Sequence, residues 1–255
     1  MSSNSLKEVI LCRGVVDSNE TQSEYIKTFE TAGYTCKHLN VLRFEFLNLK
    51  RLRERLLLPN SYGGLIVTSR RTIEAIGSAL QGHQIPNEWK KLPVFCVGPA
   101  TSSFAEKSLN FENCLGSNCG NSRELANYII KEISQNSKPL LYPCSAIARD
   151  TIEQTLNENQ INIEKFPTYN TLPAENLEND LNRITHETNP TFVFFSPSAV
   201  EFTLAAAKEK NLNIQAVAIG PATADALTKA EIRVLAVSSK PEPESLLEAV
   251  INAHL

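Results

Sequence analysis

The chain has 255 residues, of which 42% are hydrophobic and 21% are charged, and its formal net charge is −3. This composition is typical of a globular protein with apolar cores, and the length allows one large domain or two ordinary ones. No apolar run approaches the roughly 18 residues of a membrane-spanning helix, and no basic run marks a nucleic-acid surface. We therefore expect neither a membrane nor a nucleic acid as partner.

The first residues, MSSNSLKEVILCRG, lead from a polar segment directly into a short apolar run. A secretory signal would begin with basic residues and continue with a longer apolar block, so we expect a cytoplasmic protein. In a reducing compartment the six cysteines are expected to be buried thiols and not a disulfide framework. Cys114 and Cys119 have no second pair nearby, so we expect no metal site.

Short apolar runs alternate with amphipathic stretches along the chain. The runs expected to form strands are Val9–Cys12, Thr35–Leu39, Gly64–Thr68, Val94–Val97, Leu140–Pro143, Thr191–Phe195 and Ala216–Ile219. The stretches expected to form helices include Arg71–Leu80, Ser102–Leu109, Arg123–Ile133, Ile152–Asn157 and Glu244–Ile251. The apolar runs are continuous, as in parallel strands that are covered on both faces. The alternation predicts a doubly wound α/β fold.

Part of the chain is repeated. VFCVGPATSSFAEK matches AVAIGPATADALTK, with the shared Gly-Pro-Ala-Thr beginning at Gly98 and at Gly220. Upstream of these segments, LIVTSRRTIEAI matches FVFFSPSAVEFT. Two copies are too few for a solenoid, so the repeat predicts two similar α/β halves of about 125 residues each.

Each copy contains two turns in which an expected strand leads into a helix. The turns contain Thr68-Ser69, Gly98 to Thr101, Ser196 to Ser198 and Gly220 to Thr223. In parallel α/β sheets such turns lie at the carboxyl edge, where ligands bind. The start of a helix offers free N–H groups and the positive end of its dipole to an anion. Any one turn is explained as well by helix capping, but the four together predict a site for a polyanion.

The residue types in the turns also predict where the helices begin. Pro197 suits the first helical position, whereas Ser198 and Glu201 form a capping box that would start the helix later. In both Gly-Pro-Ala-Thr copies we expect the glycine to take an unusual backbone angle. We expect the threonine, Thr101 or Thr223, to cap the helix that follows.

Basic residues near strand ends are the candidates for holding a ligand's negative charge. They are Arg13, Arg70, Arg71 and Arg149, and we favour Arg71 and Arg149 because they follow strand ends. The chain has no dinucleotide fingerprint, Walker A lysine, nucleophile elbow or cysteine placed with a histidine, so we expect neither a nucleotide nor covalent catalysis. The candidate proton donor is Tyr169, which could equally be a half-buried aromatic residue of a linker.

Seven stretches resemble the animal-type uroporphyrinogen-III synthases. They are VLRFEFLNL, YGGLIVTSRRTIEA, CGNSRELANYI, LLYPCS, YNTLP, FFSPSAVEFTL and AIGPATADAL, and they follow the family's order. The resemblance implies a cyclising lyase that needs no cofactor. Its substrate would be hydroxymethylbilane, a linear tetrapyrrole with eight carboxylates. The product would be uroporphyrinogen III, formed with loss of water and inversion of ring D.

The resemblance further implies two doubly wound, flavodoxin-like domains joined by a two-stranded linker, with the substrate in a cleft between them. Residues 1–39 and 173–255 would form one domain, 44–167 the other, and about 40–43 and 168–172 the linkers. The family's cleft positions match Thr68, Ser69, Arg71, Thr101, Tyr169, Ser196 and Thr223, with Tyr169 assisting departure of the hydroxyl. We add Arg149, Ser198 and Gly220 as candidates for substrate binding. Arg70, Pro99 and Ser145-Ala146 depart from the family pattern, which leaves the cleft lining there open.

A binding protein without catalytic activity is the alternative. Two lobes that close on a small polyanion would explain the repeat and the helix starts equally well, and the resemblance alone favours an enzyme. The sequence contains no pattern typical of oligomers, so we expect a monomer.

Overall fold

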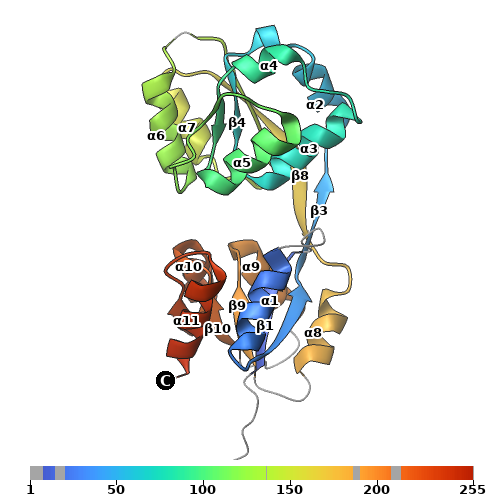
Figure 1. Ribbon diagram of the computed structural model, residues 1–255, viewed down its shortest axis with the longest axis vertical. Coiled ribbons are helices and arrows are strands. Elements are labelled where there is room, and N and C mark those ends of the chain that lie inside the picture. The colour runs from blue at the N-terminus through green and yellow to red at the C-terminus, as the bar shows by residue number, and fades with distance from the viewer. Residues whose placement is uncertain (1–7, 15–20, 136, 186–189, 208–213, 255) are drawn as a thin grey trace, which may run out of the picture. The chain divides into compact units, whose positions relative to one another are not determined.

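The computed structural model describes residues 8–14, 21–135, 137–185, 190–207 and 214–254. The chain forms two compact units: unit 1 consists of Met1–Arg43 and Leu172–Leu255, and unit 2 of Phe44–Thr171. Each unit contains one sheet with helices on both of its faces (Figure 1). In the ranges described, no helix is both long and apolar enough to cross a membrane.

The sheet of unit 1 has the strand order β11-β10-β9-β1-β2, and all neighbouring strands are parallel. Its strands are β1 (Glu8–Arg13), β2 (Thr35–Asn40), β9 (Thr191–Phe194), β10 (Gln215–Ala218) and β11 (Val234–Val237). Its helices are α1 (Thr21–Thr31), α8 (Leu177–Thr185), α9 (Pro197–Ala207), α10 (Pro221–Lys229) and α11 (Pro243–Ala253). Val9 and Leu11 pack under α1 and α11, while the alternate residues Ile10 and Cys12 are equally buried. Burial on both faces explains the continuous apolar run of β1.

The sheet of unit 2 has the strand order β3-β8-β7-β4-β5-β6. Its strands are β3 (Leu42–Phe46), β4 (Gly64–Val67), β5 (Val94–Cys96), β6 (Cys114–Leu115), β7 (Leu140–Ser145) and β8 (Ile163–Pro173). Its helices are α2 (Leu49–Leu56), α3 (Arg70–Leu80), α4 (Asn87–Lys91), α5 (Gly98–Leu109), α6 (Ser122–Glu132) and α7 (Thr151–Glu158), with a 3-10 turn at Pro59–Ser61. Leu65 and Val67 pack with α2, α3 and α5, whereas Ile66 packs with α6 and α7.

The chain passes between the units along β3 and returns along β8. These strands run in opposite directions, because the Leu47 N–H donates to the Thr168 carbonyl and the Ala174 N–H donates to the Val41 carbonyl. From β8 to β6 the sheet of unit 2 is parallel.

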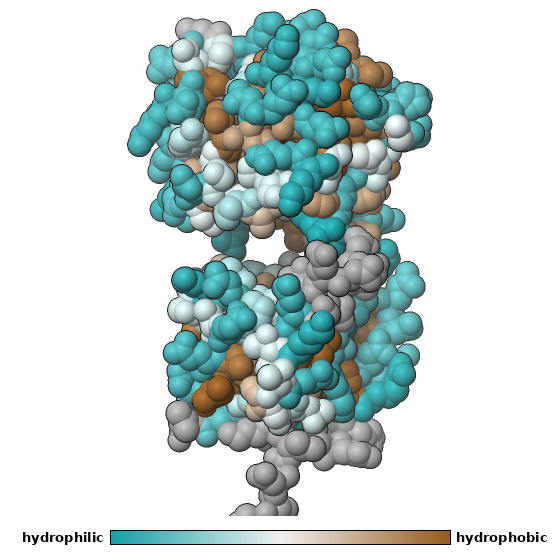
Figure 2. All heavy atoms as spheres, in the orientation of Figure 1, coloured by the Kyte–Doolittle hydropathy of each residue, from teal (hydrophilic) through white to brown (hydrophobic). Residues whose placement is uncertain are grey.

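Hydrophilic residues cover most of the face of unit 2 seen in Figure 2, with hydrophobic ones between them.

The internal repeat does not coincide with the two units. The first copy supplies β1, β2, β4, β5 and β6, and the second supplies β7, β8, β9, β10 and β11. In space, β2-β1-β9-β10-β11 of unit 1 corresponds to β8-β7-β4-β5-β6 of unit 2. Each sheet therefore combines the first two strands of one copy with the last three of the other. When the five corresponding strands of each sheet are numbered by their order within a repeat copy, both sheets have the flavodoxin-like order 2-1-3-4-5. The predicted fold class is therefore confirmed.

Candidate functional site

The candidate residues of each unit follow strands at the carboxyl edge of its sheet. In such folds ligands bind outside this edge, at the point where the strand order reverses. The reversal lies between β7 and β4 in unit 2 and between β1 and β9 in unit 1. Ser69 follows β4, and Ser196 follows β9. The turns that the sequence singled out therefore lie beside these two points.

In unit 2 the structure brings Ser69 and Tyr169 together. Ser69 caps α3, because its Oγ accepts a hydrogen bond from the Thr72 N–H at 3.3 Å. The same hydroxyl lies 2.9 Å from the Tyr169 hydroxyl, with which it shares a hydrogen bond. Tyr169 belongs to β8 and is only 7% exposed, and the Phe44 ring packs edge-on against it at 6.0 Å. Tyr169 is therefore a buried residue, not a half-buried one, and it lies on the strand along which the chain returns to unit 1.

The surroundings of Tyr169 keep its phenol protonated. Burial raises its pKa above the ordinary value of a tyrosine, and the Ser69 hydrogen bond and the Arg71 charge oppose that rise only in part. The Arg71 guanidinium lies 4.3 Å from the centre of the Phe44 ring and is paired with Glu74. At neutral pH this edge of unit 2 thus presents a proton donor with a guanidinium nearby.

The other candidates of unit 2 are more dispersed. Thr68 is half-buried at the end of β4 and interacts with the phenol of Tyr142, whose pKa burial raises to about 12. Arg149 is exposed on the turn between β7 and α7. Among the described residues, no hydrogen bond or ion pair joins Arg149 to Ser69 or Tyr169.

Helix α5 begins earlier than the sequence predicts. It starts at Gly98, which takes the expected positive φ of 78°, and Val97 is the N-cap residue without a side-chain hydrogen bond. Pro99 occupies the first turn, where its missing N–H costs nothing. The prediction that Thr101 caps the helix is therefore wrong, because Thr101 already lies within the first turn, half-buried.

In unit 1 the start of α9 distinguishes between the two predicted possibilities. The helix begins at Pro197, and the Ser196 Oγ accepts a hydrogen bond from the Ala199 N–H at 3.2 Å. The first-position assignment of Pro197 is confirmed. The later start at a Ser198 capping box is wrong, since Ser198 lies half-buried inside the first turn.

Helix α10 begins after Gly220, which is its N-cap residue. Gly220 has a φ of 178°, which is ordinary extended backbone, so the expected unusual angle is absent at this position. Thr223 does not cap the helix: its side chain is 3% exposed, and its N–H donates to the Gly220 carbonyl. The matching motifs of the two copies thus differ in backbone conformation.

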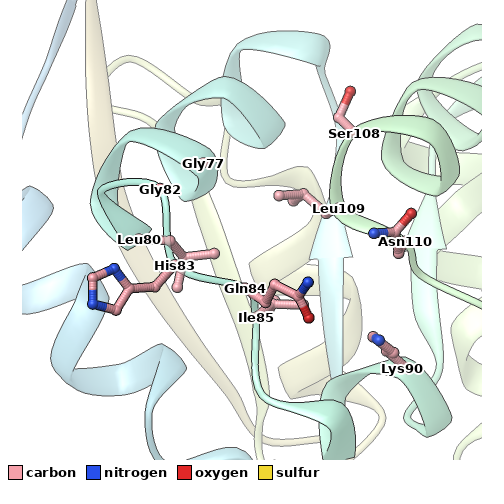
Figure 3. Close-up of a pocket in the computed structure, with 10 residues that line it drawn as sticks. All are labelled: Gly77, Leu80, Gly82, His83, Gln84, Ile85, Lys90, Ser108, Leu109 and Asn110. Atoms are coloured by element: carbon pink, nitrogen blue, oxygen red, sulfur yellow. The ribbon is translucent and has the colours of Figure 1, made fainter.

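A pocket of about 310 Å³ in unit 2 lies away from these candidates (Figure 3). It is lined by Leu80 and Gly82 at the end of α3, Leu109 and Asn110 at the end of α5, and Lys90 of α4. A helix that starts at the carboxyl edge of a parallel sheet ends near the opposite edge. The pocket is therefore not part of the site around Ser69 and Tyr169.

The sequence does not single out Arg13 of unit 1 among the basic residues near strand ends. Arg13 is the last residue of β1, beside the reversal point, and its guanidinium lies 4.8 Å from the centre of the Phe195 ring. Its position next to the expected Val9–Cys12 strand was the only local signal, because the aromatic partners come from distant segments.

Comparison with known proteins identifies the family. Residues 23–248 match the family model described as uroporphyrinogen-III synthase HemD. The uroporphyrinogen-III synthase of Schizosaccharomyces pombe is 31% identical over 89% of this chain and 90% of the relative. That of Saccharomyces cerevisiae is 30% identical over 84% of this chain and 83% of the relative.

Solved structures agree in fold. The uroporphyrinogen-III synthetase of Helicobacter pylori matches 96% of this chain and 99% of its own with a TM-score of 0.69 at 17% identity. A mutant uroporphyrinogen III synthase of Thermus thermophilus matches 97% of this chain and 98% of its own with a TM-score of 0.64 at 16% identity. Because the family model and the yeast relatives each match more than four-fifths of its length, the chain belongs to the uroporphyrinogen-III synthase family.

Proposed function

We propose that the chain converts hydroxymethylbilane into uroporphyrinogen III, with loss of water and inversion of ring D. The observation that carries this proposal is the family match over residues 23–248. A two-lobed binding protein without activity would have no reason to match these enzymes over most of its length. The enzyme acts in tetrapyrrole biosynthesis without a cofactor, in the cytoplasm and as a monomer.

The reaction begins when the hydroxyl of the bilane leaves. Tyr169 donates its phenolic proton to this hydroxyl, the C–O bond breaks, and water departs. The resulting azafulvenium cation is stabilised by a pyrrole nitrogen and is attacked by the substituted carbon of ring D. The spiro intermediate then fragments and recloses with ring D inverted. The proton released as the pyrrole regains aromaticity returns to the Tyr169 phenolate, which restores the enzyme.

The environment of Tyr169 supports this role. Its raised pKa keeps the phenol protonated at neutral pH, and the Ser69 hydroxyl at 2.9 Å fixes its orientation. General acids typically contribute about 10²–10⁴ in rate. The substrate also cyclises unaided to the type I isomer, so the larger task of the enzyme is to hold ring D in one approach geometry. Tyr169 therefore accelerates the reaction and does not by itself determine the isomer.

The helix starts of both units supply the binding groups. The first-turn N–H groups of α3, α5, α9 and α10 attract the substrate carboxylates, each by about 0.3–1 kcal/mol. The residues that we assign to binding are Thr68, Ser69, Arg71, Thr101 and Arg149 of unit 2, and Ser196, Ser198, Gly220 and Thr223 of unit 1. Thr223, with its buried side chain, contributes by shaping the start of α10.

The test is to incubate the protein with freshly prepared hydroxymethylbilane, oxidise the products and separate the isomers. We expect type III to form faster than the uncatalysed type I. Type I alone, at the uncatalysed rate, would refute the proposal. The Tyr169→Phe variant should be strongly slowed but still make type III. Tyr62→Phe is its matched control, because the Tyr62 phenol is also buried in unit 2 but donates to Glu164 at 2.6 Å. Equal rates for the two variants would remove the donor role.

A further inference from the structure

The guanidinium of Arg13 is held in place at the carboxyl end of β1. It lies 4.8 Å from the centre of the Phe195 ring, just after β9, and 5.5 Å from that of Tyr25 in α1. The two rings pack edge-on at 5.1 Å, and the Tyr25 hydroxyl donates to the Pro241 carbonyl at 2.8 Å. Cation–π contacts of this kind orient an arginine without using its N–H groups.

Among the described residues, part of the hydrogen-bonding capacity of Arg13 is left unfilled. Its Nη1 is buried without an acceptor, and among the described residues no carboxylate pairs with it. Burial lowers the pKa of the Arg13 guanidinium, and the nearby Tyr25 phenol opposes that fall. His38, beside it, has a pKa lowered by burial and by the Arg13 charge, so it stays neutral and adds no second cation there. A guanidinium that is half-buried and unpaired is costly until an anion binds it.

The position of Arg13 indicates which anion this is. Arg13 ends β1 and Phe195 follows β9, so the cation lies at the reversal point of the unit 1 sheet. Phe195 directly precedes Ser196, which caps α9. The positive end of α9 and the Arg13 charge therefore favour a negative group at the same edge.

We propose that Arg13 binds a carboxylate of the tetrapyrrole substrate. The inference rests on the proposed function, which supplies a ligand with many carboxylates. Carboxylates suit this site because a guanidinium pairs with them through charge-assisted and often bidentate hydrogen bonds. The two edge-on rings of Tyr25 and Phe195 hold the guanidinium ready for this contact. Arg13 is thus a substrate-binding residue that anchors the substrate to unit 1.

The test compares Arg13→Gln with Arg233→Gln. Arg233 is exposed and directly precedes β11, so this control removes the same charge at the amino ends of the strands of the same sheet. KM and kcat are measured for type III formation, and binding of reduced uroporphyrinogen III is measured anaerobically. Loss of a charged hydrogen bond should raise KM and the product Kd about ten-fold or more, while kcat changes little. Arg233→Gln should change neither. The salt dependence of KM should weaken in Arg13→Gln only.

If Arg13→Gln does not fold, Arg13→Lys answers the question, since lysine keeps the charge but lacks the planar fork. It should raise KM by about three-fold and retain the salt dependence. Unchanged KM and Kd in a folded Arg13 variant would overturn the proposal. If the wild type makes no type III, the proposed function fails, whereas Arg13 is still tested by binding of uroporphyrinogen III.

Discussion

The hydrogen bond between Ser69 and Tyr169 is the contact on which the proposed acid depends, and its strength can be measured by a double-mutant cycle. The cycle consists of Ser69→Ala, Tyr169→Phe and the double variant. Ser69→Ala removes the cap of α3 and the partner of the Tyr169 hydroxyl together. Tyr169→Phe removes only the second interaction, because Ser69 keeps its hydrogen bond from the Thr72 N–H.

The structure gives the expected magnitudes. Loss of a serine cap costs about 1 kcal/mol. A buried hydroxyl left without a partner costs about 1–3 kcal/mol, and we take the lower end because the Thr72 side chain also reaches Tyr169. Ser69→Ala should therefore lower the free energy of unfolding of unit 2 by about 2 kcal/mol. In the Tyr169→Phe background the same change should cost about 1 kcal/mol, which leaves a coupling of about 1 kcal/mol.

Urea unfolding followed by tryptophan fluorescence suits this measurement. The chain has one tryptophan, Trp89, and it is fully buried in the core of unit 2, so its emission reports on that unit. Such a probe is needed because a chain with two units need not unfold in one step. Ser196→Ala is the matched control: it removes the corresponding cap of α9 in unit 1 and should cost about 1 kcal/mol by circular dichroism.

The reasoning is refuted if the coupling is below about 0.3 kcal/mol, the scatter expected for independent sites. Equal costs for Ser69→Ala and Ser196→Ala would lead to the same conclusion. Ser69 would then be an ordinary cap, and the orientation of the phenol would have to come from the Phe44 contact.

Two further predictions concern the same edges of the sheets. The pKa of Tyr169 is raised, so its phenol loses its proton only above the ordinary tyrosine value of about 10. The kcat for type III formation should therefore stay level up to about pH 10 and fall at higher pH. A pH–rate profile of Tyr169→Phe should lack this fall. Gly98→Ala should destabilise unit 2 by about 1–2 kcal/mol because its φ is 78°, whereas Gly220→Ala, with extended backbone, should change stability by less than about 0.5 kcal/mol. An added Cβ meets no atom within 4 Å at either glycine, so urea unfolding of the pair isolates the backbone effect.

Six of the seven strands that the sequence predicts lie inside their sheets and are buried on both faces, whereas the seventh, β2, is an edge strand in which only Leu39 is buried. The seven predicted runs correspond to β1, β2, β4, β5, β7, β9 and β10, each within two residues of its bounds. The strands not predicted are β3, β6 and β11 at sheet edges and β8 beside β3. None of the residues of β11 is buried, and β6 has two residues. An edge strand is covered on fewer sides, so it lacks the continuous apolar run that marks a central one.

At the four turns of the repeat, the helix starts were predictable only where a serine side chain makes the cap. Ser69 and Ser196 both accept a backbone hydrogen bond, as their type and position indicate. In the Gly-Pro-Ala-Thr turns the helix begins at or just after the glycine, and the threonine arrives too late to cap it. The start there depends on the path of the backbone from the strand, which residue type alone does not determine.

The contacts between distant residues were not predictable from local patterns. Ser69 and Tyr169 are 100 positions apart and meet because β7 lies between β4 and β8 in the sheet. Arg13 acquires its aromatic neighbours from α1 and from the residue after β9. A pattern within one segment identifies the residue, but strand order decides which residues it contacts.

The repeat separates what the two units share from what distinguishes them. Both retain a serine cap after the third strand of the common order and a Gly-Pro turn after the fourth, so both offer a helix start to an anion. They differ at the ends of the first two strands: Ser145 lies opposite Tyr169 in unit 2, and Arg13 lies opposite Asn40 in unit 1. A shared feature cannot give the units different roles. The proton donor that we propose for unit 2 and the carboxylate anchor that we propose for unit 1 are therefore both assigned to the strand ends at which the copies have diverged.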